Sequence, residues 1–314
     1  QYVDFGHVDM ITTQDYSFCA WVKTDRPGMI LNEFLNYPNE PDGDAGENAG
    51  DKIGYELRII DADGGGGGVA GYTSGDEGKV EFVHQVWHTA TNKRLSIKSN
   101  LAITDDAWHH IVVTGDRDGD LLMYIDGVLQ DDDKSLDTAP LSGGINTSET
   151  GSDYEKLIIG IESKNLGAGT NNNAWFKGSI DEVAIFVDRV LHPTNDVTRF
   201  FNGGSPIDIS KETGLEAYWR FDDGGATVLD SSEKDYTGTL MKATTGNHEA
   251  GQLSDTVLKD DEAPFYAELV GQTVKNITDG SSGTVASFQS TTQITLNDLT
   301  GGTDDSWDSA ATNG

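Results

Sequence analysis

Residues 105–130 read DDAWHHIVVTGDRDGDLLMYIDGVLQ, and this stretch decides the fold class. It contains two runs rich in β-branched and aromatic residues, WHHIVVT (108–114) and LLMYID (121–126), which favour strands. GDRDGD separates the two runs, and Asp126-Gly127 follows the second. An Asp-Gly pair supplies the positive φ angles that a tight hairpin turn requires. The stretch therefore predicts two successive β-hairpins.

Alternation of side chains with a period of two, as in a β-strand, occurs both before and after this stretch. In Tyr16–Val22, for example, apolar side chains alternate over seven residues, which predicts a strand with both faces at least partly covered. Further strands are expected in IGYELRII (53–60), KVEFV (79–83), KRLSIKS (93–99), KLIIG (156–160) and SIDEVAIFV (179–187). One short helix is expected in 192–204, capped by Thr194 or Asn195 and ended by Gly203 or Gly204. Many short antiparallel strands favour an all-β fold, an antiparallel jelly-roll β-sandwich.

The charge balance excludes several classes of partner. With Asp+Glu 53 against Lys+Arg 21, the 314-residue chain has a formal net charge of −32. Such a surface repels the phosphates of nucleic acids and anionic lipids. No apolar run approaches the ~18 residues of a membrane span, so no membrane insertion is expected. The single cysteine, Cys19, excludes an intrachain disulfide and is expected to be buried in a strand.

Composition changes after residue 202. Residues 1–202 form the predicted sandwich, and residues 203–262 contain a linker followed by an apolar strand at 215–223. Residues 263–314 carry short Thr- and Val-rich strands, and we expect a separate small β module with a mobile acidic tail there.

Three segments together carry a family resemblance: YVDFGHVDMITTQDYSFCAWVKTD (2–25), residues 105–130, and KLIIGIESKNLGAGTNNNAWFKGSIDEVAIFVDRVLHPTNDV (156–197). They resemble the laminin G-like and pentraxin-like domains of the concanavalin A-type lectin/glucanase superfamily. The resemblance implies a concanavalin A-like sandwich, with a buried Trp and structural histidines at 108–110. Residues 263–314 resemble short β modules of phage structural proteins.

GLEAYWRFDDGGATVLDSSEKDYTGTL (214–240) resembles the strand that normally opens this family's domain, yet here it follows the domain. The strand could fold back in cis to complete the sheet, begin an unfinished second repeat, or insert into a neighbouring subunit's sheet edge. Trp219 and Phe221 are the residues that would complete the sheet. We favour the cis arrangement, because a Trp-rich strand needs shelter from water.

The spacing of the acidic residues differs from that in the enzymes of the superfamily. Glucanases of this fold carry Glu-x-Asp-x-x-Glu on one strand, and no such spacing occurs here. Asp181 and Glu182 are adjacent, so on a regular strand their carboxylates point to opposite faces. We therefore predict a protein that is not an enzyme, with a glycan-active hydrolase or lyase as the alternative.

The resemblance also implies calcium as a structural cofactor. After Gly160 the pentraxin-like ligand pattern is matched only by Glu162, since Lys164 stands where an anion is needed. A second site of the glucanase relatives would correspond to Asp181, with Asp222 and Asp223 from the displaced strand. Oxygen ligands from such loops suit calcium.

Aromatic residues are the candidates for contact with sugar. Trp87 lies between His84 and His88 in an expected loop, FVHQVWHTATN. Trp87, His88 and Trp175 are therefore predicted to contact carbohydrate, because an indole ring packs on the apolar face of a pyranose. The prediction is a structural or adhesive protein, extracellular or on the surface of a virion or filament. Its partners would be glycans or cell-surface polysaccharide, with self-assembly or virion and filament partners as the alternative.

Overall fold

The fold is described from a computed structural model of the chain. The described residues are 1–6, 8, 10–11, 13–37, 51–61, 74–88, 91–130, 133–136, 156–161, 176–223, 227–241, 257–259, 269–271, 273–275, 281–290 and 293–301. The chain divides into two compact units: the larger contains Tyr2–Leu166 and Asn171–Met241, and the smaller contains Lys242–Gly314.

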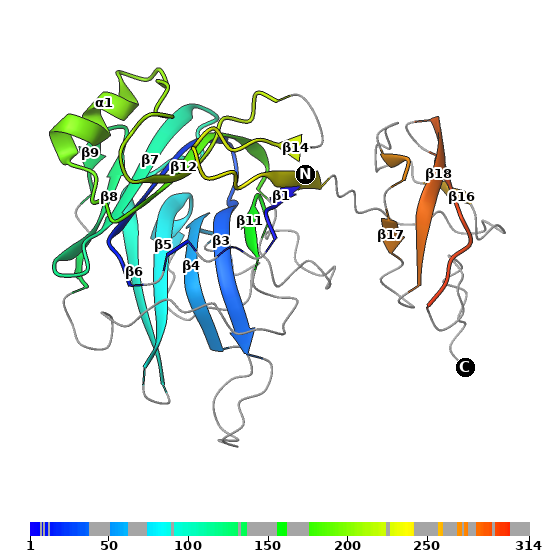
Figure 1. The fold of residues 1–314 in the computed structure, drawn as a ribbon, viewed down its shortest axis with the longest axis horizontal. Coiled ribbons are helices and arrows are strands. Elements are labelled where there is room, and N and C mark those ends of the chain that lie inside the picture. Colours follow the sequence, from blue (N-terminus) through cyan, green and yellow to red (C-terminus); the bar gives the residue numbers. More distant parts are fainter. Residues whose placement is uncertain are drawn as a thin grey trace. The chain divides into compact units, whose positions relative to one another are not determined.

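The larger unit is an antiparallel β-sandwich of two sheets, as the sequence predicted (Figure 1). Sheet A has eight strands, in the order β14 (Thr227–Val228), β15 (Gly238–Met241), β1 (Tyr2–Asp4), β11 (Leu157–Ile159), β3 (Gly28–Tyr37), β4 (Asp51–Ile59), β5 (Lys79–His88) and β6 (Thr91–Ala102). Sheet B has seven, with β10 (Lys134–Ser135), β8 (Asp120–Ile125), β7 (Trp108–Gly115), β2 (Tyr16–Thr24), β12 (Gly178–Val187) and β13 (Leu215–Trp219) in order, and β9 (Val128–Leu129) paired with β8.

The core lies between the sheets, and alternation along the strands builds it. In β2, Phe18, Ala20 and Val22 point inward and are at most 2% exposed. They pack against inward side chains of sheet A, and Phe18 lies 4.8 Å from the ring of Tyr55. Both predicted hairpins are present, and Asp126 and Gly127 have φ angles of 52° and 79°, as a tight turn between β8 and β9 requires.

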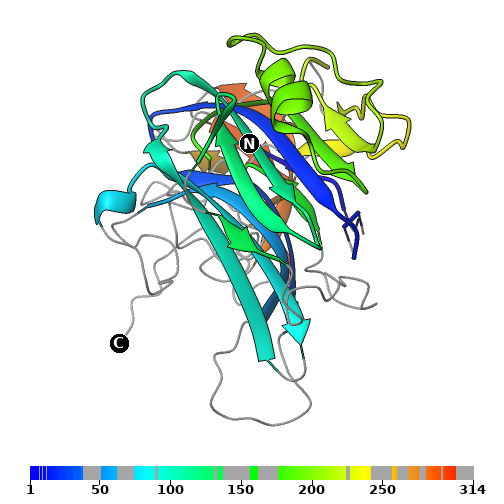
Figure 2. The same cartoon turned by 90° about the vertical axis from the view of Figure 1, so that its left-hand side faces the viewer.

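The outer face of sheet B is covered by the chain between β12 and β13. This segment contains a short π-helical turn, η3 (Pro193–Val197), and α1 (Thr198–Phe201), which lies on the outer side of the sheet (Figure 2). The expected helix is therefore present but differs at both ends. His192 caps it by accepting hydrogen bonds from the backbone N–H groups of Thr194 and Asn195, and it ends at left-handed Asn202. No helix in the described part of the chain has the length and apolarity that a membrane crossing requires.

Residues 82–88 and 91–92 lie in strands, so the expectation of a loop is wrong for these residues. They belong to the hairpin of β5 and β6, which pair from Lys79↔Ala102 to His88↔Thr91. His84 is fully buried between the sheets, where its Nδ1 lies 2.8 Å from the Tyr16 hydroxyl. Arg117 donates to its Nε2 over 3.2 Å. The polar residues of this stretch predicted a loop. The strand continues because Tyr16 and Arg117 provide hydrogen-bond partners for His84 in the interior.

The displaced strand lies beside β12 of its own chain. β13 pairs with β12, with Val183 opposite Trp219 and Ile185 opposite Ala217. β15 then pairs with β1 at the end of sheet A. The segment 215–241 thus ends both sheets of the sandwich.

The smaller unit contains a four-stranded antiparallel sheet with a core of its own. Its strands, in order, are β16 (Val257–Lys259), β19 (Gln293–Leu296), β18 (Ser282–Ser290) and β17 (Thr273–Lys275). Leu269, Val285, Ile294, Leu296 and Leu299 form the core on one face. β16 lies before the residue 263 at which the sequence suggested that the module begins. The remaining element, the 3-10 turn η1 (Ser74–Asp76), belongs to the larger unit and precedes β5.

Candidate functional site

Sheet B offers a covered and an accessible part on its outer face. Leu191, Val197 and Phe200 of the covering segment pack over outward side chains such as Val112 and Phe186. At the other end of the strands, Trp108 is 43% exposed, and Ser179, two strands away, is exposed as well. This end of the face is accessible to a ligand.

Trp108 belongs to a row of three residues across neighbouring strands. It lies opposite Lys23 of β2, and Lys23 lies opposite Ser179 of β12. Directly opposite side chains on one face have Cβ atoms about 4.5–5.5 Å apart. An exposed indole thus lies beside an ammonium, with a hydroxyl on the next strand beyond it, and we call Trp108, Lys23 and Ser179 the Trp108 row.

The row behind it contains two buried aromatic side chains and a half-buried carboxylate. His110, Trp21 and Asp181 lie opposite one another there. The Trp21 and His110 rings are 5.0 Å apart with 30° between their planes, and Phe201 from α1 stacks on Trp21 at 6.0 Å. Burial lowers the pKa of His110 to about 4, so its imidazole is neutral at pH 7. This packing gives the Trp108 row a rigid base.

His109 fixes the two turns that flank Trp108. Its Nδ1 lies 2.8 Å from an Asp126 oxygen in the β8–β9 turn, and its Nε2 lies 3.1 Å from Asp105 in the turn before β7. The hydrogen bond with Asp126 raises the pKa of His109, although burial opposes the shift. The other Asp126 oxygen accepts the backbone N–H of His110. As the sequence indicated, the paired histidines are structural.

Next to the row, the regular course of β12 is interrupted. Glu182 has a φ of 50°, and the pairing with β2 shifts between Asp181 and Ala184. A non-glycine residue in this region is uncommon and marks a local distortion. The Glu182 carboxylate accepts the Tyr218 hydroxyl on the outer face, where Trp21, the partner of Asp181, also lies. The expectation that Asp181 and Glu182 face opposite sides is therefore wrong, because a bulge breaks the alternation on which it relied.

Asp181, Glu182, Arg220 and Asp222 form a charged cluster, which we call the Asp181 cluster. Burial raises the pKa of Asp181, and the nearby Asp222 raises it further. Burial also raises the pKa of Glu182, against the hydrogen bond from Tyr218. Arg220 lies 3.2 Å from Asp222 and 3.9 Å from Glu182, so it partly neutralises the group.

The predicted calcium ligands are only partly brought together. Asp181 and Asp222 share the cluster, whereas Asp223 accepts the backbone N–H of Leu229 over 2.9 Å and Glu162 lies outside the described residues. Within the described ranges, no three His, Cys, Asp or Glu side chains lie together as a metal ion would need. Arg220 already pairs with Asp222. The described residues alone therefore do not fit a calcium site.

The predicted sugar-contacting residues stay predictions. Trp87 and His88 are the last two residues of β5, described for their backbone only, and Trp175 lies outside the described residues. Of the two sheet-completing residues, Trp219 is fully buried and Phe221 packs against the core with a φ of 54°.

Sequence reasoning missed Trp108 as a surface residue. The family resemblance implied a buried Trp there, and the exposure of 43% corrects this. The signal present was its position at the first residue of a strand, directly after Asp105, Asp106 and Ala107. Its partner Lys23 became known only from the register.

The geometry agrees with the comparison of the sequence with known families. The model of the concanavalin A-like lectin/glucanases superfamily, Laminin_G_3, matches residues 1–195. The chain belongs to this superfamily. The match ends before β13, so the segment that completes both sheets lies outside it. No curated protein matches the chain.

Solved structures show likenesses at low identity. A candidate carbohydrate-binding protein from Bacteroides ovatus is 17% identical with a TM-score of 0.49, and the match covers 76% of this chain and 55% of that one. A native heptameric SAP-like pentraxin from Limulus polyphemus is 14% identical with a TM-score of 0.38, with coverages of 64% and 81%. The CBM40 of the IT-sialidase from Ruminococcus gnavus is 13% identical with a TM-score of 0.38, with coverages of 60% and 83%. This chain thus spans about half the length of the Bacteroides protein.

Proposed function

We propose that the chain is a non-catalytic carbohydrate-binding β-sandwich that acts outside the cell or on the surface of a virion or filament. The observation that carries the proposal is the exposed Trp108 on the outer face of sheet B, in a chain of the lectin/glucanase superfamily. An indole offers a large apolar face to the C–H side of a pyranose. Lys23 lies beside Trp108, and Ser179 lies on the far side of Lys23, where both side chains could hydrogen-bond the ring hydroxyls. Such a combination of one apolar surface with a few polar groups is typical of ligand sites.

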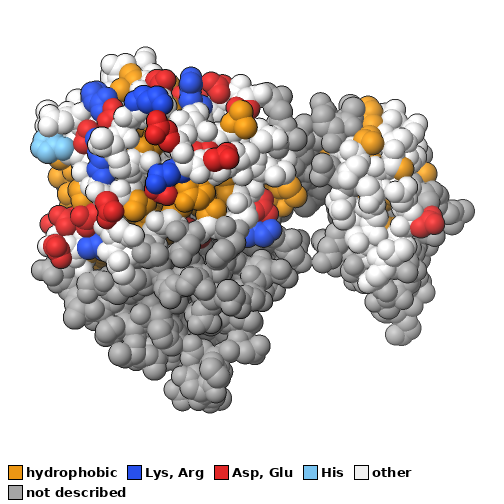
Figure 3. All heavy atoms as spheres, viewed as in Figure 1, with side chains coloured by type: hydrophobic (Ala, Val, Ile, Leu, Met, Phe, Trp, Pro, Cys, Tyr) orange, Lys and Arg blue, Asp and Glu red, His pale blue; other side chains and the backbone are white. Residues whose placement is uncertain are grey.

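The charges around the row favour neutral or amino-bearing glycans. Lys23 lies 3.8 Å from Asp106, Arg220 lies 3.2 Å from Asp222, and His109 lies between two carboxylates. These cations are thus already matched by acidic side chains. Acidic and basic side chains also lie interspersed over the coloured part of the larger unit in Figure 3. A sulfated or uronic-acid polymer would also meet the net charge of −32.

Binding to a panel of neutral, amino, uronic and sulfated polysaccharides tests the proposal. We expect neutral or amino polymers to bind and Trp108→Ala to weaken binding at least about tenfold, since a Trp anchor contributes about 2 kcal/mol or more. Leu229→Ala is the matched control, because Leu229 is 52% exposed and belongs to the segment after β13. Absence of binding to every polymer would overturn the proposal.

Calcium is proposed as a stabilising ion, at Glu162 or at Asp181 with Asp222 and Asp223, the two positions that the family resemblance implies. If an ion binds at either position, EDTA lowers the thermal midpoint and added calcium restores it. An unchanged midpoint removes calcium from the account.

The Asp181 cluster favours a second candidate function, glycan hydrolysis. Two neighbouring carboxyls with raised pKa values are the groups that acid–base chemistry uses. Release of reducing sugar by the protein, lost in both Asp181→Asn and Glu182→Gln, would establish this function. We prefer the binding function because Tyr218 and Arg220 already engage Glu182.

A further inference from the structure

The segment that follows α1 contains several hydrogen bonds between its own residues. Asp230 is its centre, and its carboxylate accepts the backbone N–H groups of Tyr218, Ser232 and Tyr236 at 2.8–2.9 Å. The Trp219 indole donates to the Tyr236 carbonyl over 2.7 Å. β14 and β15 pair with each other as well. Residues 206–241, which we call the arm, therefore contain hydrogen bonds of their own in addition to their contacts with the rest of the sandwich.

The arm contacts the rest of the sandwich, which we call the body, through the ends of both sheets. β13 is the last strand of sheet B, and β14 and β15 are the last two strands of sheet A. Trp219 fills the core between them, with its ring 4.2 Å from that of Phe5. Because the arm lies at sheet ends, it can leave without any other strand crossing it, and it would uncover two unpaired strand edges. Such edges readily pair with another chain.

An exposed hinge joins the arm to the body. Asn202, Gly203 and Gly204 have φ angles of 43°, 64° and 97° in succession, and residues 202–206 are all exposed. A Cβ at Gly203 or Gly204 would meet no atom within 4 Å, so neither residue is held by packing. The connection to β13 is long enough to reach a neighbouring molecule, since an extended chain spans about 3.3–3.6 Å per residue.

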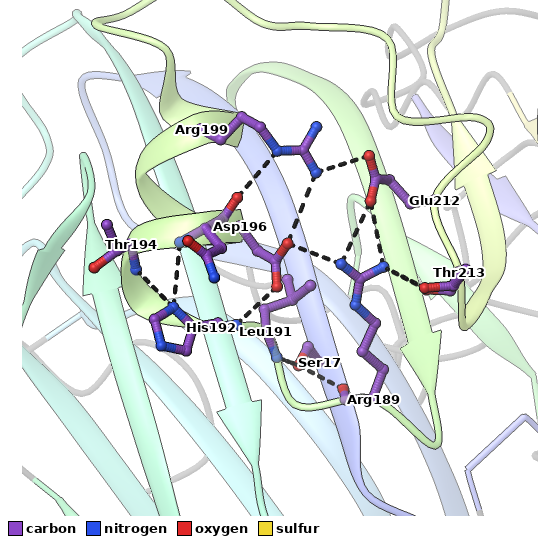
Figure 4. Close-up of polar contacts among 10 residues, drawn as sticks. Ser17, Arg189, Leu191, His192, Thr194, Asp196, Arg199, Glu212 and Thr213 are labelled. Atoms are coloured by element: carbon purple, nitrogen blue, oxygen red, sulfur yellow. Dashed lines mark hydrogen bonds and ion pairs between the residues drawn. The ribbon is translucent and has the colours of Figure 1, made fainter.

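After the hinge, polar contacts fasten the arm to the body (Figure 4). Glu212 lies 2.7 Å from Arg199 and 3.4 Å from Arg189, and the Thr213 carbonyl accepts a hydrogen bond from Arg189. Partly exposed ion pairs of this kind contribute little each, about 0–1 kcal/mol. The arm of a second copy could make the same contacts, because both arginines belong to the body.

We propose that the arm exchanges between two copies of this chain, so that each body is completed by the arm of the other. The exchanged interface repeats the interface of the single chain, as in domain swapping, and the two forms differ only at the hinge. Dilute chains keep the arm in cis because its effective concentration there is high, and concentrated chains exchange it. The surface that receives the partner is the pair of edges of β1 and β12, and the partner is a second copy of this protein. The proposal does not depend on glycan binding.

A disulfide between arm and body distinguishes the two forms in the full chain. Tyr2 of the body lies opposite Met241 of the arm, a spacing that a disulfide can bridge. Under mild oxidation, the variant Tyr2→Cys with Met241→Cys links within one chain when the arm is in cis and between chains when it is exchanged. Asp120→Cys with Ser135→Cys is the matched control, because both strands of that pair belong to the body. Cys19 is buried, and burial raises the pKa of its thiol, so it does not compete.

While linked dimers are scarce, we expect the fraction of chains of the first variant in linked dimers to increase about tenfold for each tenfold increase in protein concentration, as mass action requires. The control variant stays within one chain at every concentration. Deleting Gly203–Ser205 strains the folded-back path and increases the linked dimer further. Complete oxidation of the first variant within single chains at all concentrations, with or without the deletion, would overturn the proposal.

Discussion

The buried imidazole of His110 makes a specific prediction about stability and pH. His110 is 2% exposed, lies against Trp21, and has a pKa lowered from 6.5 to about 4 by burial. The unfolded chain therefore takes up a proton at this position near pH 6.5, whereas the folded chain does so only near pH 4. As pH falls through this window, the free energy of unfolding decreases.

The size of the effect follows from the shift. A change from 6.5 to about 4 is about 2.5 pH units, and each unit corresponds to 1.36 kcal/mol, so His110 removes about 3 kcal/mol in total. Solvent does not screen this contribution to the unfolding free energy, because the ring is buried. The variant His110→Phe keeps an aromatic ring against Trp21 and cannot be protonated. We expect it to lose this pH dependence.

Urea unfolding of both proteins between pH 4 and 8, followed by Trp fluorescence, measures the effect. The difference in unfolding free energy between His110→Phe and the parent should move by about 3 kcal/mol in favour of the variant from pH 8 to pH 4. Comparison of the two proteins cancels the contributions of other titrating groups. A constant difference across this range would refute a neutral, buried His110.

Two further predictions concern the same sandwich. The pKa of His109 is raised, so its contribution is present below pH 6.5 and is lost as pH rises through the folded pKa; His109→Gln should therefore cost more stability at pH 6 than at pH 9, measured by urea unfolding. Trp219→Ala should cost about 3–5 kcal/mol, because it empties a fully buried site against Phe5, and Leu229→Ala at an exposed site should cost little in the same thermal scan. Equal effects of the two substitutions would show that Trp219 does not anchor the arm.

Local sequence signals predicted the elements well. The hairpin at Asp126-Gly127 follows from turn chemistry, which acts between neighbouring residues, and the structure confirms it. The burial of Cys19 follows from alternation along one strand and is confirmed too. Such features depend on few residues, all close in sequence.

Features that depend on distant partners could not be predicted in this way. His84 is interior because Tyr16 and Arg117 supply its partners, and neither is near it in sequence. The bulge at Glu182 places its carboxylate beside the Tyr218 hydroxyl, 36 residues further on. Trp108 is accessible because the covering segment does not reach it. No local sequence pattern predicts how far that segment extends. The candidate site thus depends on the pairing register of the strands and on which part of sheet B the segment between β12 and β13 covers. Both arise only in the folded chain.

The central claim is that the Trp108 row binds glycans, and titration calorimetry with a neutral or amino polysaccharide that binds the parent protein tests it most directly. Trp108→Ala, Trp87→Ala and Leu229→Ala should be compared once thermal scans show that their midpoints equal that of the parent protein. The account predicts that affinity falls at least about tenfold in Trp108→Ala and stays unchanged in the other two. Unchanged affinity in Trp108→Ala, with a loss in Trp87→Ala, would contradict the account and place the site at the tip of the β5–β6 hairpin.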